Sequence, residues 1–196
     1  MKIIVVGIGK VGYTVADQLS NEHHDVTIVD TNEKVLNAVL NNLDVIAVHG
    51  NGASRKVLSE AGVEESDLVI ALTGSDEINL LCCLLATKLG ANGTIARVRN
   101  HVYYEDVRLI KDSLGLSMVI NPEKEAAEEI LRILKYPSAK NIDTFAKGKI
   151  NIVSFTATKN CTLCGQAVKD SFSGLKARAL ACAVERENKI FIPFGD

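Results

Sequence analysis

Hydrophobic and polar positions alternate between two patterns along the first two thirds of this chain. Short runs that are apolar throughout, such as "IIVV", predict strands buried on both faces, and longer amphipathic runs predict helices. The predicted strands are Ile3–Val6, Val26–Val29, Val45–Val48, Leu68–Leu72, Thr94–Val98 and Ser117–Ile120. The predicted helices are Val11–Leu19, Glu33–Leu40, Ser54–Glu60, Glu77–Leu89, Tyr104–Leu114 and Glu123–Leu134.

This regular strand–helix alternation predicts the fold class. Strands that are apolar on both faces and joined by crossover helices form a parallel sheet covered on both sides, and such crossovers are right-handed. With a glycine-rich turn in the first unit, the pattern predicts an α/β, Rossmann-like doubly wound sheet of order 3-2-1-4-5-6. We expect this domain to span residues 1–136.

The pattern changes after Pro137. Residues 137–149 are polar and predict a linker, and residues 150–196 predict a small partial α+β piece. Within that piece we expect strand-like sequence at 150–156 and 177–185, a short helix at 163–170, and a hairpin through 186–188 into 189–193. These few elements are too small to form a good hydrophobic core by themselves. Either the piece packs on a partner, or the chain is cut within a second domain. The ending "FIPFGD", a strand running into a turn, favours the cut.

The glycine-rich turn has the form G-x-G-x-x-G and comprises Gly7, Ile8, Gly9, Lys10, Val11 and Gly12. It follows a buried strand and opens a helix, which is the context that dinucleotide binding requires. The first glycine allows the turn, the second lets the backbone approach a pyrophosphate, and the third lets helix and strand pack closely. Amides at the helix N-terminus would then face the phosphates.

Further polar residues follow the other strands, at the sheet edge where ligands bind in this fold. Asp30 and Thr31 end the second strand, and a carboxylate there accepts hydrogen bonds from ribose and repels a 2′-phosphate, which favours NAD(H) or an adenosine nucleotide. Asn51 follows the third strand, with His49 near enough to reach a ribose. Thr73 and Gly74 follow the fourth strand and should flank the phosphates.

Arg97 lies within an otherwise apolar strand, so its guanidinium needs an anion or several acceptors. One interpretation is a bound phosphate. The other is an internal salt bridge to Asp76 or Glu123, because buried arginines are usually paired.

Charge and cysteine content exclude several classes. The net charge of −2 gives no long-range attraction to nucleic acid or anionic lipid, and the apolar runs are far shorter than the ~20 residues of a membrane span. Of five cysteines, Cys82, Cys83 and Cys182 have apolar neighbours, which indicates buried, reduced thiols in a cytoplasmic protein. Cys161 and Cys164 form a C-x-x-C pair without the further ligands that zinc requires, so a redox sensor stays an alternative.

Signatures of catalysis are absent from the sequence: there is no Y-x-x-x-K, H-E-x-x-H, G-x-S-x-G or P-loop motif. A hydride-transfer enzyme also needs a substrate pocket with an acid or base. The sequence therefore favours a nucleotide sensor that is not an enzyme. The alternative is an NAD-dependent oxidoreductase whose substrate domain is missing from this chain.

Five stretches together resemble one family: "VVGIGKVGYTVADQL", "VTIVDTNEKVL", "GNGASRKVLSEAGVEESDLVIALTGSDEINLLCCLLATKLG", "TIARVRN" and "VINPEKEAAEEI". They resemble the RCK (KTN) regulatory subunits of potassium transport, especially the TrkA type, from residue 2 to about residue 134. From residue 149 onward the chain resembles the start of the family's C-terminal domain. The sequence "NGA" at 51–53 departs from the family's usual acidic Gly-Asp-Gly.

The resemblance implies a cytoplasmic, peripheral subunit that docks on a membrane potassium channel or transporter. It implies homo-oligomers, from dimers to tetramers or larger rings, and a response to NAD(H) or ATP/ADP. By position, the three motif glycines hold phosphates, Asp30 the ribose, Lys10 a terminal phosphate, and Arg97 faces phosphate. Glu123 matches a residue at the family's dimer interface, where some members place a cation. The apolar last helix, which contains Ile130, Leu131, Ile133 and Leu134, fits either an oligomer element or a core helix of the single chain.

Overall fold

The computed structural model describes residues 1–146, 149–158, 161, 163–168 and 179–193. The chain forms two compact units, residues 1–129 and 130–196, and each is described here by itself. Helix α6 begins in the first unit and ends in the second.

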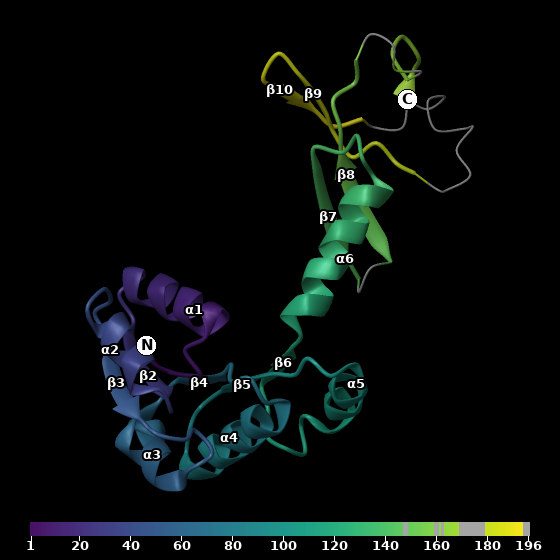
Figure 1. Cartoon of the computed structure of the whole chain (residues 1–196). Coiled ribbons are helices and arrows are strands. Elements are labelled where there is room, and N and C mark those ends of the chain that lie inside the picture. Colours follow the sequence, from purple (N-terminus) through teal and green to yellow (C-terminus); the bar gives the residue numbers. More distant parts are fainter. Residues whose placement is uncertain (147–148, 159–160, 162, 169–178, 194–196) are drawn as a thin grey trace. The chain divides into compact units, whose positions relative to one another are not determined.

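The first unit contains six parallel strands in the order β3-β2-β1-β4-β5-β6 (Figure 1). The strands are β1 (Lys2–Val6), β2 (Asp25–Asp30), β3 (Ile46–His49), β4 (Leu68–Ala71), β5 (Thr94–Arg97) and β6 (Met118–Ile120). The helices are α1 (Lys10–Asn21), α2 (Glu33–Leu40), α3 (Arg55–Glu60), α4 (Asp76–Leu89), α5 (His101–Ile110) and α6 (Pro122–Lys135), with a 3₁₀ turn η1 (Val63–Glu65) before β4. The predicted Rossmann-like fold and strand order are confirmed.

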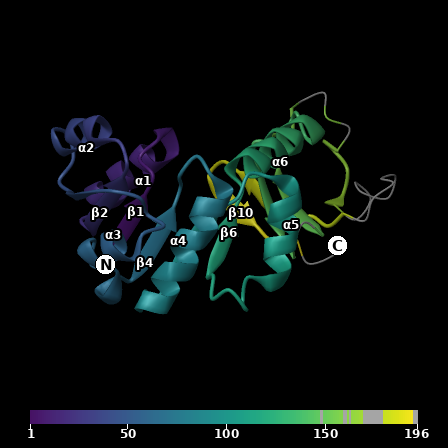
Figure 2. The ribbon, with the colours of Figure 1, turned by 60° about the horizontal axis from the view of Figure 1, so that its bottom comes forward.

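Helices cover both faces of this sheet (Figure 2), and each face has its own hydrophobic core. On one face, Ile3, Val5 and Ile28 pack with Ala16 of α1 and Leu36 of α2. On the other face, side chains of β1, β4 and β5 pack with α3, α4 and α5. This core includes Ile4, Val6, Val69, Leu58, Cys82, Cys83, Ala96 and Tyr104. Alternate residues of β1 thus enter opposite cores, which explains why its sequence is apolar at every position from Ile3 to Val6.

The register places the ends of the strands together. Val6 of β1 pairs with Val29 of β2 and with Ala71 of β4, and Asp30 pairs with His49 of β3. Because β1 is followed by α1 on one face and β4 by α4 on the other, the loops after β1 and β4 diverge and leave a crevice between them.

The predicted linker at 137–149 is corrected by the structure. Strand β7 (Asn141–Phe145) lies within it and pairs antiparallel with β8 (Ile150–Ser154). Four of the five β7 residues are exposed, so cross-strand hydrogen bonds rather than a buried face stabilise this strand. Because these residues form no apolar face, the hydrophobic pattern of the sequence did not predict strand β7.

The predicted hairpin is confirmed by strands β9 (Val184–Arg186) and β10 (Lys189–Phe191), which pair antiparallel. Its two turn residues, Glu187 and Asn188, have φ angles of 52° and 60°, as a two-residue turn of the I′ type requires. Of the helix predicted at 163–170, residues 163–165 form turns and residues 169–170 lie outside the described residues. The strand-like sequence predicted at 177–185 begins outside them too, at 177–178, and only its last two residues belong to β9.

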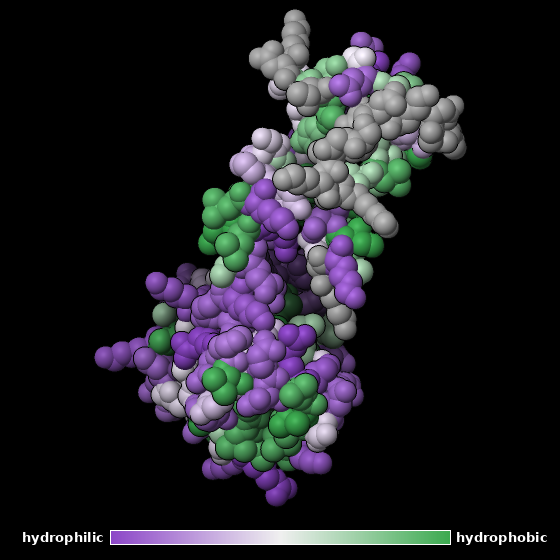
Figure 3. Space-filling view, turned by 90° about the vertical axis from the view of Figure 1, so that its right-hand side faces the viewer, coloured by the Kyte–Doolittle hydropathy of each residue, from purple (hydrophilic) through white to green (hydrophobic). Residues whose placement is uncertain are grey.

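Helices α5 and α6 expose apolar side chains, some of which are visible in green in Figure 3. In α6, Ile130, Leu131, Ile133 and Leu134 are each more than half exposed, and no residue of the helix is buried. The two interpretations of α6, an oligomer element and a core helix, stay predictions. No helix among the described residues has the length and apolar character of a membrane span.

The two cysteines of α4 are fully buried, as the sequence predicts, whereas Cys182 is exposed. Burial raises the pKa of Cys82 from 9.0 to about 12 and raises that of Cys83 further. These raised pKa values leave very little thiolate at neutral pH, and the thiolate is the reactive form. We expect a chromogenic thiol reagent to label Cys164 and Cys182 at once in the native protein, and Cys82 and Cys83 only after denaturant is added. Rapid native labelling of the peptide that contains Cys82 would contradict this burial.

Candidate functional site

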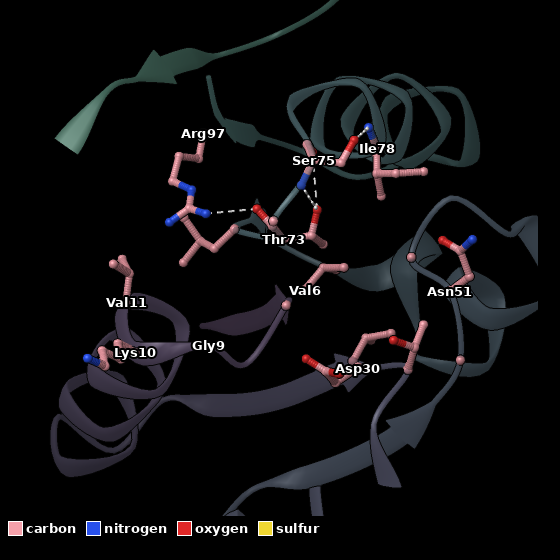
Figure 4. Close-up of a pocket in the computed structure, with 17 residues that line it drawn as sticks. Val6, Gly9, Lys10, Val11, Asp30, Asn51, Thr73, Ser75, Ile78 and Arg97 are labelled. Atoms are coloured by element: carbon pink, nitrogen blue, oxygen red, sulfur yellow. Dashed lines mark hydrogen bonds between the residues drawn. The ribbon is translucent and has the colours of Figure 1, made fainter. Parts of the chain in front are cut away.

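A cavity of about 500 Å³ lies at the carboxyl ends of the central strands (Figure 4). It is lined by the loops that follow β1, β2, β3 and β4, by the first turn of α1, and by the end of β5. The lining residues are Val6, Gly7, Gly9, Lys10, Val11, Val29, Asp30, Thr31, Gly50, Asn51, Gly52, Leu72, Thr73, Gly74, Ser75, Ile78 and Arg97. Its size lies within the range of small-ligand pockets.

The turn after β1 depends on two of its glycines. Gly7 has a φ of +91°, and a Cβ there would lie 2.6 Å from the Thr73 amide nitrogen. A Cβ on Gly12 would lie 2.0 Å from the Gly7 carbonyl oxygen, so α1 packs directly on the turn. This close packing directs the N-terminus of α1 into the cavity.

The N-terminus of α1 is suited to bind an anion. The first N–H groups of a helix have no intrahelical acceptor, and the helix dipole places partial positive charge there. The first turn of α1 contains no acidic residue that would compensate this charge. Gly9, Lys10 and Val11 all line the cavity at this point.

Asp30 lines the cavity and also braces the glycine turn. Its Oδ2 accepts a hydrogen bond from the Ile8 N–H at 2.7 Å, and its Oδ1 accepts one from the Asn32 N–H at 2.8 Å. A carboxylate has about four acceptor positions, so both oxygens retain capacity for a ligand hydroxyl. The cap of α2 is Asn32, whose side chain accepts from the Lys34 N–H, so capping is not the role of Asp30.

The loop after β4 is held by Asn79, a fully buried residue of α4. The Asn79 Oδ1 accepts hydrogen bonds from the Thr73 N–H at 2.8 Å and from the Thr73 hydroxyl at 2.7 Å. Its Nδ2 donates to the Thr73 carbonyl at 3.2 Å and to the Arg97 carbonyl at 2.9 Å. One amide side chain therefore fixes the ends of β4 and β5 beside the cavity.

Arg97 is 9% exposed, and its Nη2 donates to the Thr73 carbonyl at 2.9 Å. Its Nε has no hydrogen-bond partner within the described part of the chain. No ion pair joins Arg97 to Asp76 or Glu123 among the described residues, and Asp76 pairs with Arg99 instead. The salt-bridge interpretation of Arg97 is thus not what the structure shows, and the guanidinium keeps donor capacity at the cavity wall.

Ten of the twelve residues predicted for the site line this one cavity: Gly7, Gly9, Lys10, Val11, Asp30, Thr31, Asn51, Thr73, Gly74 and Arg97. The other two, Ile8 and Gly12, are buried and do not line it, although the Ile8 amide binds Asp30. Figure 4 shows Lys10, Val11 and Arg97 on one side of the cavity and Asn51 on the other.

Several lining residues were not among the predicted site residues. Val6, Val29, Leu72 and Ile78 look like ordinary core positions in the sequence, and only the divergence of the loops exposes them to the cavity. Gly50, Gly52 and Ser75 lie in the strand-end loops that the sequence identifies. Their position in these loops could have identified them as site residues.

Two other candidates lie apart from the cavity lining. The Nε2 of His49 is 2.9 Å from the Thr31 carbonyl oxygen, so this ring contacts backbone. Glu123 is exposed in the first turn of α6, and no group of three or more His, Cys, Asp or Glu side chains within the described ranges could hold a metal ion. A cation at Glu123 stays a prediction that concerns an interface between chains.

The residues present fit a nucleotide. An uncompensated helix N-terminus and a buried arginine with an unpartnered Nε suit phosphate, and the Asp30 carboxylate suits ribose hydroxyls. A Cβ on Gly9 would meet nothing within 4 Å, so this part of the backbone is open to close approach by a ligand.

Several known proteins with similar sequences are named as potassium uptake proteins. A Trk system potassium uptake protein TrkA homolog of Archaeoglobus fulgidus is 36% identical over 196 residues, which cover all of this chain and 44% of the relative. The TrkA protein of Haemophilus influenzae is 37% identical over 171 residues, 86% of this chain and 37% of its own length. The chain thus spans less than half the length of these relatives.

Solved structures agree with the fold. The TrkA-N domain of the inner membrane protein ybaL from Escherichia coli superposes with a TM-score of 0.60 at 22% identity, and the match covers 68% of this chain and 96% of that domain. The GsuK channel bound to NAD superposes with a TM-score of 0.52 at 26% identity, over 61% of this chain and 21% of that one. A GsuK structure bound to ADP gives the same TM-score and identity, over 61% of this chain and 31% of that one.

The sequence profile of the TrkA-N domain matches residues 3–122, the part that forms the sheet, its covering helices and the cavity. This match extends over more than half of the chain and agrees with the resemblance seen in the glycine turn and the following motifs. The chain therefore belongs to the TrkA-N domain family.

Proposed function

We propose that this chain is the nucleotide-binding part of a regulatory subunit that controls a membrane potassium transporter in response to NAD(H) or to ATP and ADP. The main support is the cavity, where the N-terminus of α1 and the buried Arg97 face the same space as Asp30. The transport role is supported by the relatives named as potassium uptake proteins and by the similarity to the GsuK channel.

In this proposal, some lining residues bind the phosphates of the nucleotide and others bind its ribose. Backbone N–H groups at Gly9, Lys10 and Val11 would receive a pyrophosphate, with Arg97 on the same side of the cavity. Asp30 would accept hydrogen bonds from ribose hydroxyls, with Thr31 and Asn51 beside it. The ligands of the two GsuK structures, NAD and ADP, share this adenosine and pyrophosphate chemistry.

The position of Asp30 favours NAD(H) over its 2′-phosphorylated analogue. Both Asp30 oxygens accept hydrogen bonds from backbone amides, which hold the carboxylate at the cavity wall. A 2′-phosphate next to this carboxylate would meet like charge in a partly buried site.

The cavity supports binding rather than chemistry on the nucleotide. Among the described residues that line it, the titratable side chains are Lys10, Asp30 and Arg97. Arginine stays protonated in proteins, Asp30 is engaged by two amides, and Lys10 is exposed to solvent, so none of the three is placed as a proton-transfer group. We therefore propose a sensor and not an enzyme.

Regulation would follow from linkage. A nucleotide shifts a conformational equilibrium only by its difference in affinity for the two states. A tenfold preference supplies about 1.4 kcal/mol, and several coupled sites in a homo-oligomer multiply the effect. In this proposal the subunit lies at the cytoplasmic face of the membrane, bound to the transporter.

Replacing Asp30 by alanine is expected to weaken binding of every ribose-bearing ligand. The change removes an acceptor for the ribose and the brace on the Ile8 amide, and hydrogen bonds to charged groups contribute about 1.5–3 kcal/mol each. Titration calorimetry with NADH should show a dissociation constant raised roughly 10–150-fold.

Asp25→Ala is the matched control for this variant. Asp25 is an exposed aspartate at the opposite end of the same strand, far from the cavity lining. Its substitution should leave NADH affinity unchanged. Equal affinities for wild type and Asp30→Ala would remove Asp30 from the site.

Thermal unfolding and coenzyme turnover together test the nucleotide part of the proposal. A ligand at 100 times its dissociation constant stabilises the folded state by about 2.7 kcal/mol, so NADH, NAD, ATP or ADP should raise the melting temperature. Nicotinamide absorbance should stay constant when NADH and candidate carbonyl compounds are added. Its steady loss would instead support the oxidoreductase alternative.

The transport part is tested in cells that lack the gene for this protein. Restoring the natural full-length protein should restore rubidium influx, a tracer of potassium uptake, and the same protein with Gly9→Ala should not. Equal influx with and without the protein would contradict a regulatory role.

A further inference from the structure

The loop after β4 connects the cavity to a second place in the fold. Thr73, Gly74 and Ser75 line the cavity, and the next residue, Asp76, begins α4 without lining it. Asp76 is only 7% exposed although it is charged. A buried carboxylate is costly unless hydrogen bonds or charges compensate it.

The compensation for Asp76 comes from the loop between β5 and α5. Its Oδ2 accepts hydrogen bonds from the backbone N–H of Arg99 at 2.9 Å and from that of Asn100 at 2.7 Å. Asn100 is the cap of α5, and its side chain accepts from the Val102 N–H at 2.9 Å. One carboxylate oxygen therefore holds the cap residue of α5 and the residue before it.

The Arg99 side chain adds a second connection between the same two loops. Its Nε lies 3.7 Å from the Asp76 Oδ1, and its Nη2 donates to the carbonyl of Gly74. Gly74 lines the cavity, so Arg99 and Asp76 together join a cavity loop to the start of α5. By contrast, the hydrogen bonds of Asn79 reach Thr73 and Arg97, and so end at β5.

We propose that Asp76 is a positioning residue that couples nucleotide binding in the cavity to the order of the first turn of α5. The inference rests on the proposed function, because it needs a ligand that contacts the loop after β4. A ligand that holds Thr73 and Gly74 in one arrangement also holds Asp76, and the two amide hydrogen bonds transmit this restraint to Arg99 and Asn100. Arg99 and Asn100 do not need to touch the ligand for this restraint to reach them.

Hydrogen exchange of the whole chain, with and without saturating NADH or ADP, tests this coupling. In wild type we expect nucleotide to slow exchange in the cavity loops and also at residues 99–104, by about 5–150-fold at the latter. In Asp76→Ala the nucleotide should still slow exchange in the cavity loops, while its effect at residues 99–104 disappears. A residue with only a structural role would instead change exchange equally with and without nucleotide.

Two further variants separate the explanations. Asp76→Asn keeps a carbonyl oxygen that can accept both amide hydrogen bonds, so it should retain the coupling; loss of coupling in this folded variant would overturn the proposal. Glu77→Ala is the matched control, because Glu77 lies in the same turn and its hydrogen bond reaches only Ser75 of the same loop. It should behave like wild type, and an equal loss of coupling in Glu77→Ala would also overturn the proposal.

The outcomes distinguish this inference from the proposed function. If no adenine nucleotide slows exchange anywhere in wild type, the proposed function fails. If nucleotide slows exchange in the cavity loops of every variant and its effect at residues 99–104 is the same in wild type and Asp76→Ala, only the coupling through Asp76 fails.

Discussion

Gly12→Ala is expected to destabilise the protein by about 2 kcal/mol or more, although alanine is the better helix former by about 1 kcal/mol. The added Cβ would lie 2.0 Å from the Gly7 carbonyl oxygen, a backbone atom in a turn that is itself packed on Thr73. Neither atom can move away without separating α1 from β1. Thermal unfolding should show a melting temperature lowered by at least roughly 4 °C.

Gly9→Ala is the matched substitution in the same turn, and the opposite result is expected. Its Cβ would meet nothing within 4 Å, and the φ of −75° suits alanine, so the melting temperature should stay close to that of wild type. The methyl group would occupy space where a pyrophosphate approaches the backbone, so NADH affinity should fall at least about tenfold. Gly9→Ala with normal affinity, or Gly12→Ala with normal stability, would contradict this description of the turn.

Arg97→Met is expected to weaken nucleotide binding without lowering stability. The methionine keeps an apolar stem in the buried position and removes a charge whose Nε has no partner among the described residues. The Thr73 carbonyl, the acceptor of Arg97, also accepts from Asn79, so it stays hydrogen-bonded. A lost charged hydrogen bond to phosphate corresponds to roughly 10–150-fold in affinity.

Calorimetry with ADP and thermal unfolding without ligand check this prediction together. Replacement of a buried charge by an apolar side chain of similar size is often neutral or stabilising. A strong fall in melting temperature combined with unchanged ADP affinity would show that Arg97 has a purely structural role.

The fold of the first unit could be predicted from the sequence because each central strand is buried on both faces. Residues of β1 enter the two cores alternately, which leaves an unbroken apolar run followed by glycines. Strand β7 could not be predicted in this way. It is mostly exposed and forms through pairing with β8, so its residues have no apolar pattern.

The site was predictable where a residue type has a specific backbone or charge role. Gly7, Asp30 and Arg97 fall into this group. The sequence shows a glycine directly after a strand, a carboxylate at a strand end and an arginine within an apolar strand, and the structure places all three at the cavity. The partner of Asp76 was not predictable. Arg97 and Arg99 are close together in the sequence, and only the folded loop shows that Asp76 binds the second.

Titration calorimetry of the wild-type chain with NADH, NAD, ADP and ATP tests most directly whether the cavity is a nucleotide sensor. The predicted result is saturable binding of at least one of these ligands at one site per chain, with the nicotinamide absorbance of the NADH sample unchanged afterwards. Absence of saturable heat with all four, or consumption of NADH during the titration, would contradict it.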